Sequence, residues 1–343
     1  MKPIHIVGGG IAGLSLGIAL RGRGVPVALS EAGTYPRHRV CGEFLSGISE
    51  ATLRSLGLSP DVLFREAVRA RTCAWHDAEG LLLERPLPRE AWSLSRHTLD
   101  HALATQFAAA GGELRTGTRV AEEPAEGTVW AAGRRREAKA SPWVGLKLHV
   151  RGLRLDADLE MHSASSGYVG LNRIEADAVN VCGLFLKECV AGAGTASLTE
   201  TVREAGLASL HRRIAAAEPV PGSFCSVSAF RMGWQASAGD AFALRLGDAA
   251  ALIAPFTGNG MSMAFEGAAL AVGPLAVYAG GGMTWPAAVR RVRRDLHRAF
   301  RRRLLFSRLA HPFLLRPFFL RGLAHLGRTR SAVFDFAFEG TRT

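Results

Sequence analysis

The hydrophobic pattern is most regular at the beginning of the chain. An apolar run at residues 3–7 (PIHIV) leads into the glycine-rich sequence GGGIAG at residues 8–13. Apolar residues continue through a helical segment to residue 20, and a second apolar run covers residues 25–30. This order predicts a strand, a tight turn, a helix and a second strand.

The glycine spacing in this turn fits a dinucleotide-binding unit. Gly8 lets the chain turn out of the strand, Gly10 lets the backbone approach a pyrophosphate, and Gly13 lets helix and strand pack closely. Ile11 and Ala12 open the helix, where free N–H groups and the positive end of the helix dipole favour an anion. The sequence therefore predicts a phosphate site at residues 8–13.

Glu31 follows the second predicted strand, at the offset of an acidic residue that binds ribose. Its carboxylate can accept both hydroxyls of an adenosine ribose. No Arg directly follows it, which argues against a 2′-phosphate at this position. Glycine-rich turns are common, but the strands, the helix and the acid agree here, so we favour a nucleotide site over a purely structural turn.

The later pattern predicts a sheet-rich region between two segments of the nucleotide domain. From residue 144 to residue 185 the pattern shifts toward alternation, with turns at Gly167 and near Asp177, which predicts an antiparallel sheet. An apolar strand at residues 241–246 then precedes a small-residue helix that begins near Gly260. We also expect helices at residues 48–56, 96–110, 198–206 and 210–217, a hairpin of strands 71–76 and 81–85, and short strands at 113–116, 128–131 and 224–230.

The net charge of +12 comes from one C-terminal segment. Residues 1–289 carry 28 Lys and Arg against 27 Asp and Glu, whereas residues 290–330 carry 13 Arg and a single acid, Asp295. Apolar residues take one face of a predicted helix at 289–302 and arginines take the other. The segment is interpreted either as a helix with a solvated basic face or as a contact with an anionic membrane surface. No RNA motif or aromatic-interleaved basic groove favours nucleic acid.

Cysteine usage indicates a reducing compartment. The five cysteines form no CxxC pair, and no clustering of His and Cys along the sequence predicts a metal site. The first strand begins almost at Met1, which leaves no room for a signal peptide, and no uninterrupted stretch is expected to span a bilayer. We expect a cytoplasmic protein, peripheral at the inner face of the membrane if its C-terminal segment contacts lipid.

Several motifs occur in an order that is more specific than any one of them. They are GGGIAG with Glu31, RVCGE at residues 39–43, SRHTLD at 95–100, GDAA at 247–250 and PFTGNGM at 255–261. Together they resemble FAD-dependent oxidoreductases of the aromatic-hydroxylase (flavin monooxygenase) and geranylgeranyl-reductase superfamily. The resemblance runs from residue 4 to about residue 270.

The resemblance implies FAD bound in an extended form, with the pyrophosphate on the first glycine turn and the adenosine ribose on Glu31. Arg39 and Arg96 would lie near the phosphate and the ribityl chain, and Asp248 would bind a hydroxyl there. Cys41 is expected either to face the isoalloxazine or to be an inert buried cysteine, and no other catalytic residue is assigned. The implied cofactor-binding set is Gly8, Gly10, Ile11, Ala12, Gly13, Glu31, Arg39, Cys41, Gly42, Arg96, Val120, Gly247, Asp248, Pro255, Gly258, Asn259, Gly260 and Met261.

The second glycine-rich helix start supports the same reading on physical grounds. Gly258, Asn259 and Gly260 precede a helix, so they supply free N–H groups and a positive dipole end. A reduced flavin carries negative charge at its N1–C2 oxygen edge, which suits such a partner. The alternative is a glycine-rich helix entry without a ligand.

The sequence departs from hydroxylases of the superfamily at one position that concerns the reductant. Those enzymes usually have an Asp-Gly pair that contacts both flavin and nicotinamide, whereas this chain has AAGR at residues 131–134. We still expect NAD(P)H as the reductant, without that carboxylate contact. The WxWxIP motif and the early active-site lysine of tryptophan halogenases are not found, which disfavours halogenation.

Two reactions fit a flavoprotein of this kind: hydroxylation of an electron-rich ring, and hydride transfer to a carbon–carbon double bond of a prenyl or other lipid. His76, His149 and His162 are candidate bases, although each is more commonly a surface or core histidine. A hydrophobic small-molecule substrate is expected in either case. The aromatic residues that could line an apolar pocket are Trp75, Trp92, Trp143, Tyr168 and Trp234.

We therefore predict an α/β flavoprotein oxidoreductase, with monooxygenation ahead of double-bond reduction. A flavin-binding subunit or redox sensor is the non-enzymatic alternative. The predicted Rossmann-like FAD-binding domain is discontinuous and comprises residues 1–70, 95–143 and 240–300. An inserted antiparallel substrate domain comprises residues 71–94 and 144–239, and a helical basic C-terminal segment comprises residues 301–343.

Overall fold

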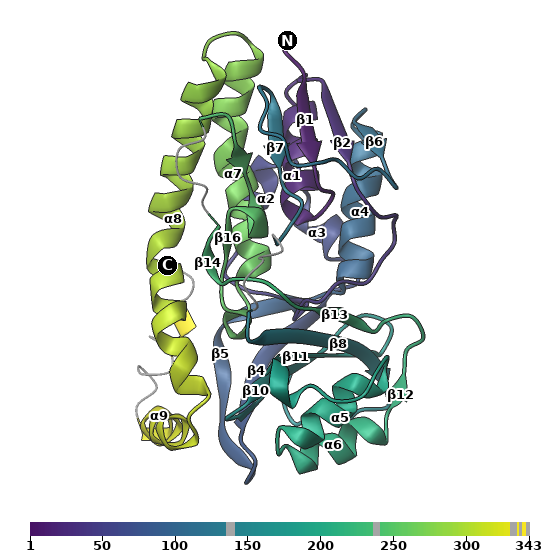
Figure 1. The fold of residues 1–343 in the computed structure, drawn as a ribbon, viewed down its shortest axis with the longest axis vertical. Coiled ribbons are helices and arrows are strands. Elements are labelled where there is room, and N and C mark those ends of the chain that lie inside the picture. The colour runs from purple at the N-terminus through teal and green to yellow at the C-terminus, as the bar shows by residue number, and fades with distance from the viewer. Residues whose placement is uncertain (135–140, 236–240, 330–334, 336–337, 341–343) are drawn as a thin grey trace.

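Two sheets organise the chain in the computed structural model, which describes residues 1–134, 141–235, 241–329, 335 and 338–340. A parallel sheet with its helices occupies the upper half of Figure 1, and a larger sheet occupies the lower half. One long helix, α8 (Trp285–Leu314), runs beside both halves. The mixed α/β architecture agrees with the predicted fold class.

The parallel sheet has five strands in the order β15-β7-β1-β2-β6. It contains the opening unit as predicted, because β1 and β2 flank helix α1 and pair in parallel. The strand expected at 241–246 is shorter, and it pairs in parallel with β7 in this same sheet. The strands are β1 (Ile4–Val7), β2 (Val27–Ser30), β6 (Glu113–Arg115), β7 (Thr128–Trp130) and β15 (Leu244–Arg245).

Helices α1 (Ile11–Arg21), α4 (Arg96–Ala109), α7 (Gly260–Ala279) and α8 form one hydrophobic core with this sheet. In α4, Leu99, Leu103 and Phe107 are buried as the predicted helical face requires. Shorter helices, α2 (Glu50–Ser55) and α3 (Pro60–Leu63), follow the loop after β2. The first of these matches the helix predicted at 48–56.

The larger sheet has nine strands and is antiparallel except where β4 pairs in parallel with β9. The predicted hairpin is present but longer, and the expected turn residue Gly167 begins a strand instead. Residues 224–230 contain a strand of only three residues. The strands are β3 (Phe44–Leu45), β4 (Val68–His76), β5 (Leu81–Ser93), β8 (Trp143–Arg151), β9 (Leu159–Ala164), β10 (Gly167–Arg173), β11 (Val179–Leu186), β12 (Glu218–Pro219) and β13 (Cys225–Val227).

The two faces of this sheet pack against different parts of the chain. One face packs against α5 (Ala196–Glu204) and α6 (Ala208–Ala215), through a cluster that includes Leu146, Val181 and Leu198. The other face carries Met161 and Tyr168, which pack with residues from the segment 227–256 and with the end of α8. Side chains alternate between the two faces because successive strand residues point in opposite directions.

The predicted domain limits do not coincide with the elements, because they fall inside β4, β8 and α8. Strand β3 lies within residues 1–70 but pairs with β5 of the larger sheet. Helix α8 continues across residue 301, because Leu296, Phe300 and Leu304 keep its apolar face buried at helical spacing. The remaining elements are α9 (Pro317–Thr329), the small sheet of β14 (Gly233–Trp234) and β16 (Ala251–Leu252), and three short 3₁₀ turns at Lys187–Cys189, Gly247–Ala249 and Pro255–Thr257.

Helix α7 corrects the expectation that no stretch is long enough to span a bilayer. Its 20 residues pass that test by length and composition, although half of the apolar window is buried within the protein. The helix packs between α1 and α8, where Phe265, Ala271 and Leu275 are fully buried. Its hydrophobicity is therefore that of a core helix.

Candidate functional site

The turn before α1 has the geometry that a bound phosphate needs. A Cβ on Gly8 (φ +110°) would lie 2.4 Å from the Ala131 carbonyl, and a Cβ on Gly13 would lie 2.0 Å from the Gly8 oxygen, so both positions require glycine. Gly10 is the N-cap of α1 and makes no side-chain capping bond. A Cβ there would meet only Arg96 Nη2, at 3.6 Å. The first turn of α1 therefore has no side-chain cap, and the space beside Gly10 adjoins the Arg96 guanidinium.

Glu31 lies beside this turn and is held as an anion. Its Oε2 accepts the Gly9 N–H at 2.8 Å, and its Oε1 accepts the Gly33 N–H at 2.9 Å and Arg37 Nη2 at 2.6 Å. Burial raises the pKa of this carboxyl, but the backbone hydrogen bonds and the charge of Arg39 lower it further, below its usual value. Arg37 is partly exposed. It must therefore move before a ribose can reach Oε1.

Two arginines converge next to the α1 start. Arg96 contacts Asp100 through Nε at 2.7 Å and Nη2 at 2.8 Å, and Arg39 Nε contacts the same carboxylate at 2.9 Å. Asp100 is fully buried, and Arg39 also contacts Glu31 Oε2 at 3.3 Å, so the three guanidiniums of Arg37, Arg39 and Arg96 share two carboxylates. The remaining positive charge favours an anion in front of Gly10.

The second glycine-rich helix start belongs to α7, which packs against α1. Asn259 is the N-cap of α7 and makes no side-chain capping bond to the helix. Its side chain instead donates to the Ser46 carbonyl at 3.4 Å and accepts from Arg303 Nη1 at 3.4 Å. Gly258 adopts a left-handed φ of +61° beside the Phe44 ring. The first N–H groups of α7 therefore have no capping side chain within the described chain.

The other predicted positions lie on segments around the two helix starts. A Cβ on Gly247 would lie 3.1 Å from the Ala12 Cβ, so the 247–248 turn adjoins the start of α1. A Cβ on Gly42 would meet nothing within 4 Å. Val120 lies in the loop after β6, two residues beyond Thr118, whose N–H donates to the Glu31 carbonyl. Ile11, Ala12 and Met261 are buried in the first turns of the two helices, and Pro255 is exposed.

The loop at residues 41–43 is fastened to the larger sheet. Asn180 Nδ2 on β11 donates to the carbonyls of Cys41 at 3.2 Å and Gly42 at 2.9 Å. Burial raises the pKa of the Cys41 thiol, and its Sγ accepts the Glu43 N–H at 3.3 Å. A protonated thiol in this position is a packing group rather than a nucleophile.

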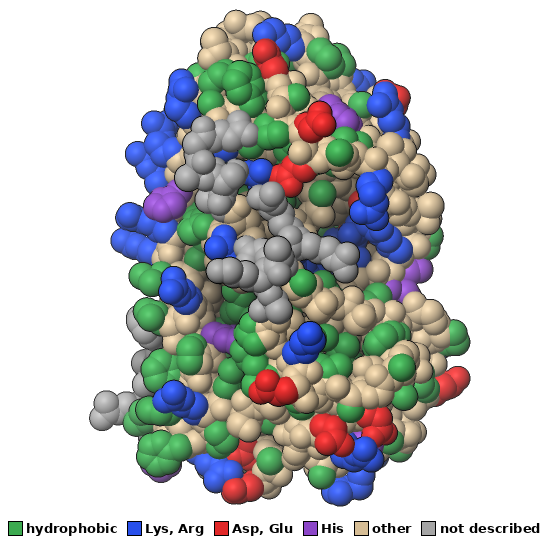
Figure 2. All heavy atoms as spheres, viewed as in Figure 1, with side chains coloured by type: hydrophobic (Ala, Val, Ile, Leu, Met, Phe, Trp, Pro, Cys, Tyr) green, Lys and Arg blue, Asp and Glu red, His purple; other side chains and the backbone are tan. Residues whose placement is uncertain are grey.

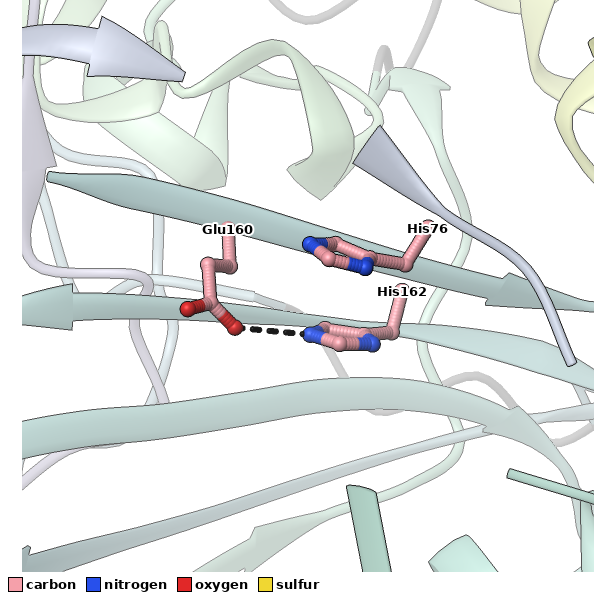
Figure 3. Close-up of side chains that lie close together, drawn as sticks. All are labelled: His76, Glu160 and His162. Carbon is pink, nitrogen blue, oxygen red and sulfur yellow. Dashed lines mark hydrogen bonds and ion pairs between the residues drawn. The ribbon is translucent and has the colours of Figure 1, made fainter. Parts of the chain in front are cut away.

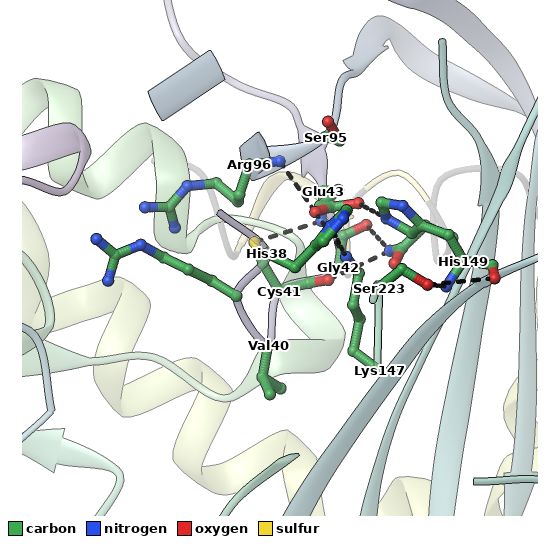
Figure 4. A network of polar contacts seen from close by, with 12 residues as sticks. His38, Val40, Cys41, Gly42, Glu43, Ser95, Arg96, Lys147, His149 and Ser223 are labelled. Atoms are coloured by element: carbon green, nitrogen blue, oxygen red, sulfur yellow. Dashed lines mark hydrogen bonds and ion pairs between the residues drawn. The ribbon is translucent and has the colours of Figure 1, made fainter. Parts of the chain in front are cut away.

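Behind the loop lies a buried network of charged groups that the sequence did not reveal (Figure 4). Glu43 and Lys147 are both fully buried, and their charged atoms lie 3.3 Å apart. His149 Nε2 lies 2.6 Å from the second oxygen of Glu43, and the Arg96 N–H donates to the first at 2.9 Å. Burial raises the pKa of Glu43, but the hydrogen bond from His149 and the charge of Lys147 hold it below its usual value. His149 is therefore occupied within this network.

His38 connects the network to partly exposed groups and makes it sensitive to pH. Its Nδ1 lies 3.3 Å from Lys147 Nζ, and its ring stacks on His97. Burial and the charge of Lys147 lower the pKa of His38 to about 4. The unfolded chain takes up this proton below about pH 6.5, the folded chain only below about pH 4, so stability is lost as the pH falls between these values.

We therefore expect the urea midpoint of unfolding to decrease from pH 7 to pH 4.5, and to decrease less in a His38→Gln variant. The measurement is equilibrium unfolding followed by circular dichroism at several pH values. A His211→Gln variant is the control, because that histidine lies on α6 and contacts the Thr199 carbonyl, outside the Glu43–Lys147 network. Equal pH slopes for wild type and His38→Gln would contradict the assignment.

A cavity of about 290 Å³ opens between the two halves of the molecule. Arg134, Val144 and residues 226–230 line it. Arg134 Nη2 donates to the Val40 carbonyl at 3.3 Å, its Nε lies 3.8 Å from Asp248, and its guanidinium covers the Phe230 ring. The segment that holds an Asp-Gly pair in hydroxylases thus presents a cation to this cavity.

An aromatic cluster adjoins the cavity through Phe230, which packs with Tyr168. Tyr168, Trp143 and Phe256 surround His311 of α8, with ring centroids 5.1–6.1 Å from its imidazole. His311 is 8% exposed, and its Nε2 has no hydrogen-bond partner among the described residues. Burial lowers the pKa of this imidazole, which keeps it neutral. No sequence pattern pointed to His311, because it lies in the arginine-rich helix.

The other candidate histidines, His76 and His162, lie with Glu160 on the far face of the sheet, in a group that the fold brings together (Figure 3). His76 and His162 stack at 4.4 Å, and His162 Nε2 lies 2.9 Å from Glu160. Arg213 of α6 contacts both oxygens of Glu160, at 2.9 and 3.0 Å. Because this guanidinium already compensates the carboxylate and repels a cation, we interpret the group as a structural network.

The aromatic residues predicted to line a pocket fall into two groups, one near the His311 cluster and one elsewhere. Trp143 and Tyr168 belong to the cluster at His311, and Trp75 packs at its edge. Trp92 stacks on Phe64, and Trp234 stacks on His297, away from the cavity lining.

No protein-family model and no curated protein sequence matches the chain. Solved structures do. The flavin-dependent brominase Bmp2 has a TM-score of 0.76 at 18% identity, covering 99% of this chain and 93% of that one. The halogenase PltM has a TM-score of 0.76 at 14% identity, with 99% and 85% covered.

PqsL, a probable FAD-dependent monooxygenase from Pseudomonas aeruginosa, has a TM-score of 0.71 at 16% identity. The match covers 97% of this chain and 99% of that one. At these identities the comparisons establish the fold. This chain therefore has the fold of flavin-dependent halogenases and monooxygenases, which agrees with the FAD-dependent aromatic-hydroxylase-like superfamily that its motifs resemble.

Proposed function

We propose that this protein is an FAD-dependent monooxygenase that hydroxylates a hydrophobic aromatic small molecule, with NAD(P)H as reductant. The observation that carries the proposal is the presence of two glycine-rich helix starts on the packed helices α1 and α7, with an aromatic cluster around Phe256 beside the second and a cavity that adjoins this cluster at Phe230. The shared fold supports flavin chemistry in general. The finer assignment rests on the residues at the cavity.

The described residues fit FAD at the starts of both α1 and α7. Gly8 and Gly13 allow the close turn into α1, the N–H groups in the first turn of α1 have no capping side chain, and Arg96 supplies the adjacent positive charge. The start of α7 at Gly260 would face the ring edge that becomes negative on reduction. When bound, FAD would supply electron transfer and oxygen activation. The protein would bind and orient the substrate and exclude water from it.

The cavity and cluster favour an aromatic substrate with a hydroxyl group. Phe230 of the cavity wall belongs to the same apolar cluster as Tyr168 and Phe256, and one neutral imidazole, His311, lies within that cluster. His311 Nε2 can accept the proton of a substrate hydroxyl, because no described group occupies it. A phenol that loses this proton becomes more electron-rich and therefore easier to hydroxylate.

We expect His311→Gln to lower kcat for a phenolic substrate about 100-fold, the scale of general base catalysis, with a smaller change in KM. The flavin content, read from absorbance of the purified protein, should be unchanged because His311 lies on α8 and not at the start of α1 or α7. The control is Trp92→Phe, a change remote from the cavity. Retention of wild-type kcat by His311→Gln would contradict the assignment.

The first experiment is an absorption spectrum of the purified protein, followed by NAD(P)H oxidation with and without oxygen. Stoichiometric oxygen uptake coupled to a hydroxylated product is the expected result. Turnover with reduced flavin under anaerobic conditions would show double-bond reduction instead, and halogenated product in the presence of bromide or chloride would show halogenation. A yellow protein that neither oxidises NAD(P)H nor consumes oxygen with phenolic substrates would contradict an enzymatic role.

A further inference from the structure

An apolar surface is exposed at the end of α8 and along α9. We call it the α8–α9 surface and define it by Leu305, Leu309, Phe313, Phe318, Phe319, Leu323 and Leu326, which are 42–83% exposed. The apolar surface continues from α8 onto α9, because the Phe313 and Phe319 ring centroids lie 5.2 Å apart. Elsewhere in the described chain the large exposed apolar residues are scattered. A contiguous patch of this kind marks an interaction site.

Arginines border this surface, and the helix carries no acid beside it. Arg301, Arg302 and Arg308 are exposed on α8, and Arg316 lies over the Phe319 ring at 6.0 Å. Residues 296–329 contain no Asp or Glu. In Figure 2, basic and hydrophobic side chains follow one another along the left edge, where α8 runs. The α8–α9 surface is therefore both apolar and positively charged.

The rest of the protein holds the two helices in place. Phe300, Leu304 and Leu314 are buried on the inner face of α8, and Leu320 is buried on α9. Arg321 of α9 forms ion pairs with Asp77 and Glu79 in the turn between β4 and β5. The outward direction of the apolar side chains is therefore set by packing on their opposite faces.

We propose that the α8–α9 surface docks the protein on an anionic lipid bilayer. Leucine and phenylalanine suit the boundary between headgroups and acyl chains, and the bordering arginines suit anionic headgroups. A second copy of this chain would oppose arginine to arginine, which disfavours a symmetric dimer through this surface. Nucleic acid would use the charge but leave the phenylalanines and leucines exposed.

Docking would place the aromatic cluster at His311 on a helix that contacts lipid. Helix α8 carries Leu309 and Phe313 on its outer face and His311 on its inner face, within the aromatic cluster. A hydrophobic substrate dissolved in the bilayer would then be supplied beside the site. This consequence rests on the proposed function, whereas docking itself does not.

The test is sedimentation of the full-length protein with vesicles of phosphatidylcholine alone and of phosphatidylcholine with 30 mol% phosphatidylglycerol (about one lipid in three). The variants are Leu309→Ser/Phe318→Ser for the apolar contact and Arg301→Gln/Arg302→Gln for the charge. Val62→Ser is the control, because Val62 is a single apolar residue, 64% exposed, on α3. Circular dichroism and gel filtration confirm that each variant is folded.

We expect binding to the anionic vesicles that weakens with salt and falls at least about tenfold in each double variant, with Val62→Ser unchanged. Because the readout is lipid binding, it is independent of turnover and separates this proposal from the enzymatic one. Equal recovery of wild type and both double variants with lipid would overturn it. So would a wild-type dimer that dissociates in Leu309→Ser/Phe318→Ser, or a preference for DNA over the anionic vesicles.

Discussion

A Gly13→Ala variant is expected to lose bound FAD and to be less stable than wild type by about 1–3 kcal/mol. Alanine normally stabilises a helix relative to glycine, so helix propensity predicts the opposite sign. At Gly13, however, the added methyl would lie 2.0 Å from the Gly8 carbonyl oxygen and 3.2 Å from Ile6. The turn and α1 must therefore separate, and the N–H groups that face the pyrophosphate move with them.

The matched control is Gly267→Ala in α7. This glycine is also buried in a helix, but a methyl there would meet Leu296 at 3.4 Å, an ordinary contact. We expect unchanged flavin content and equal or slightly higher stability for this variant. Flavin absorbance relative to protein, with urea unfolding of the same samples, measures both quantities. A yellow, fully stable Gly13→Ala protein would show that the first turn does not hold the cofactor.

A Glu43→Gln variant is expected to lower the free energy of unfolding by about 3–5 kcal/mol. The substitution keeps the shape of the side chain and an acceptor for the Arg96 N–H, but it removes the negative charge. Lys147 is fully buried and lies 3.3 Å from that carboxylate, so its ammonium group would remain buried without a compensating charge. Equilibrium unfolding in urea gives the change directly.

The Glu43→Gln/Lys147→Met double variant separates lost charge compensation from general disruption. Removing both partners takes the uncompensated charge away, so we expect the double variant to recover a large part of the stability that Glu43→Gln loses. Double-variant stability at or below that of Glu43→Gln would show that the pair contributes through shape rather than charge.

Local pattern was sufficient for much of the fold. The glycine turn, α1 and the two first strands follow from spacing within 30 residues, because each element is specified by its own sequence. The helices at 96–109, 196–204 and 208–215 follow from apolar periodicity and their end signals in the same way. The parallel pairing of β4 with β9 could not be predicted, since it joins strands about 85 residues apart.

In the candidate site too, positions within local motifs were predictable, whereas contacts between distant segments were not. Positions that the motifs predicted, such as Gly10, Arg96 and Asn259, lie at or beside the starts of α1 and α7. Their roles toward a cofactor stay predictions. The partners of Glu43 come from β8, a hundred residues away, and nothing in the sequence marks Lys147 as buried. His311 was concealed by the arginines around it, because its importance depends on which face of α8 is covered.

The length of α8 has a mechanical consequence. Arg303, on the buried side of this helix, bonds to Glu266 at 2.8 Å and to the N-cap Asn259 at 3.4 Å. Helix α8 therefore carries both the outward-facing leucines of the α8–α9 surface and the Arg303 guanidinium, which contacts the N-cap of α7. If the α8–α9 surface docks on a bilayer as proposed, a tilt of α8 would move Arg303 and its contacts at the start of α7, so docking and the proposed cofactor site would be coupled through one helix.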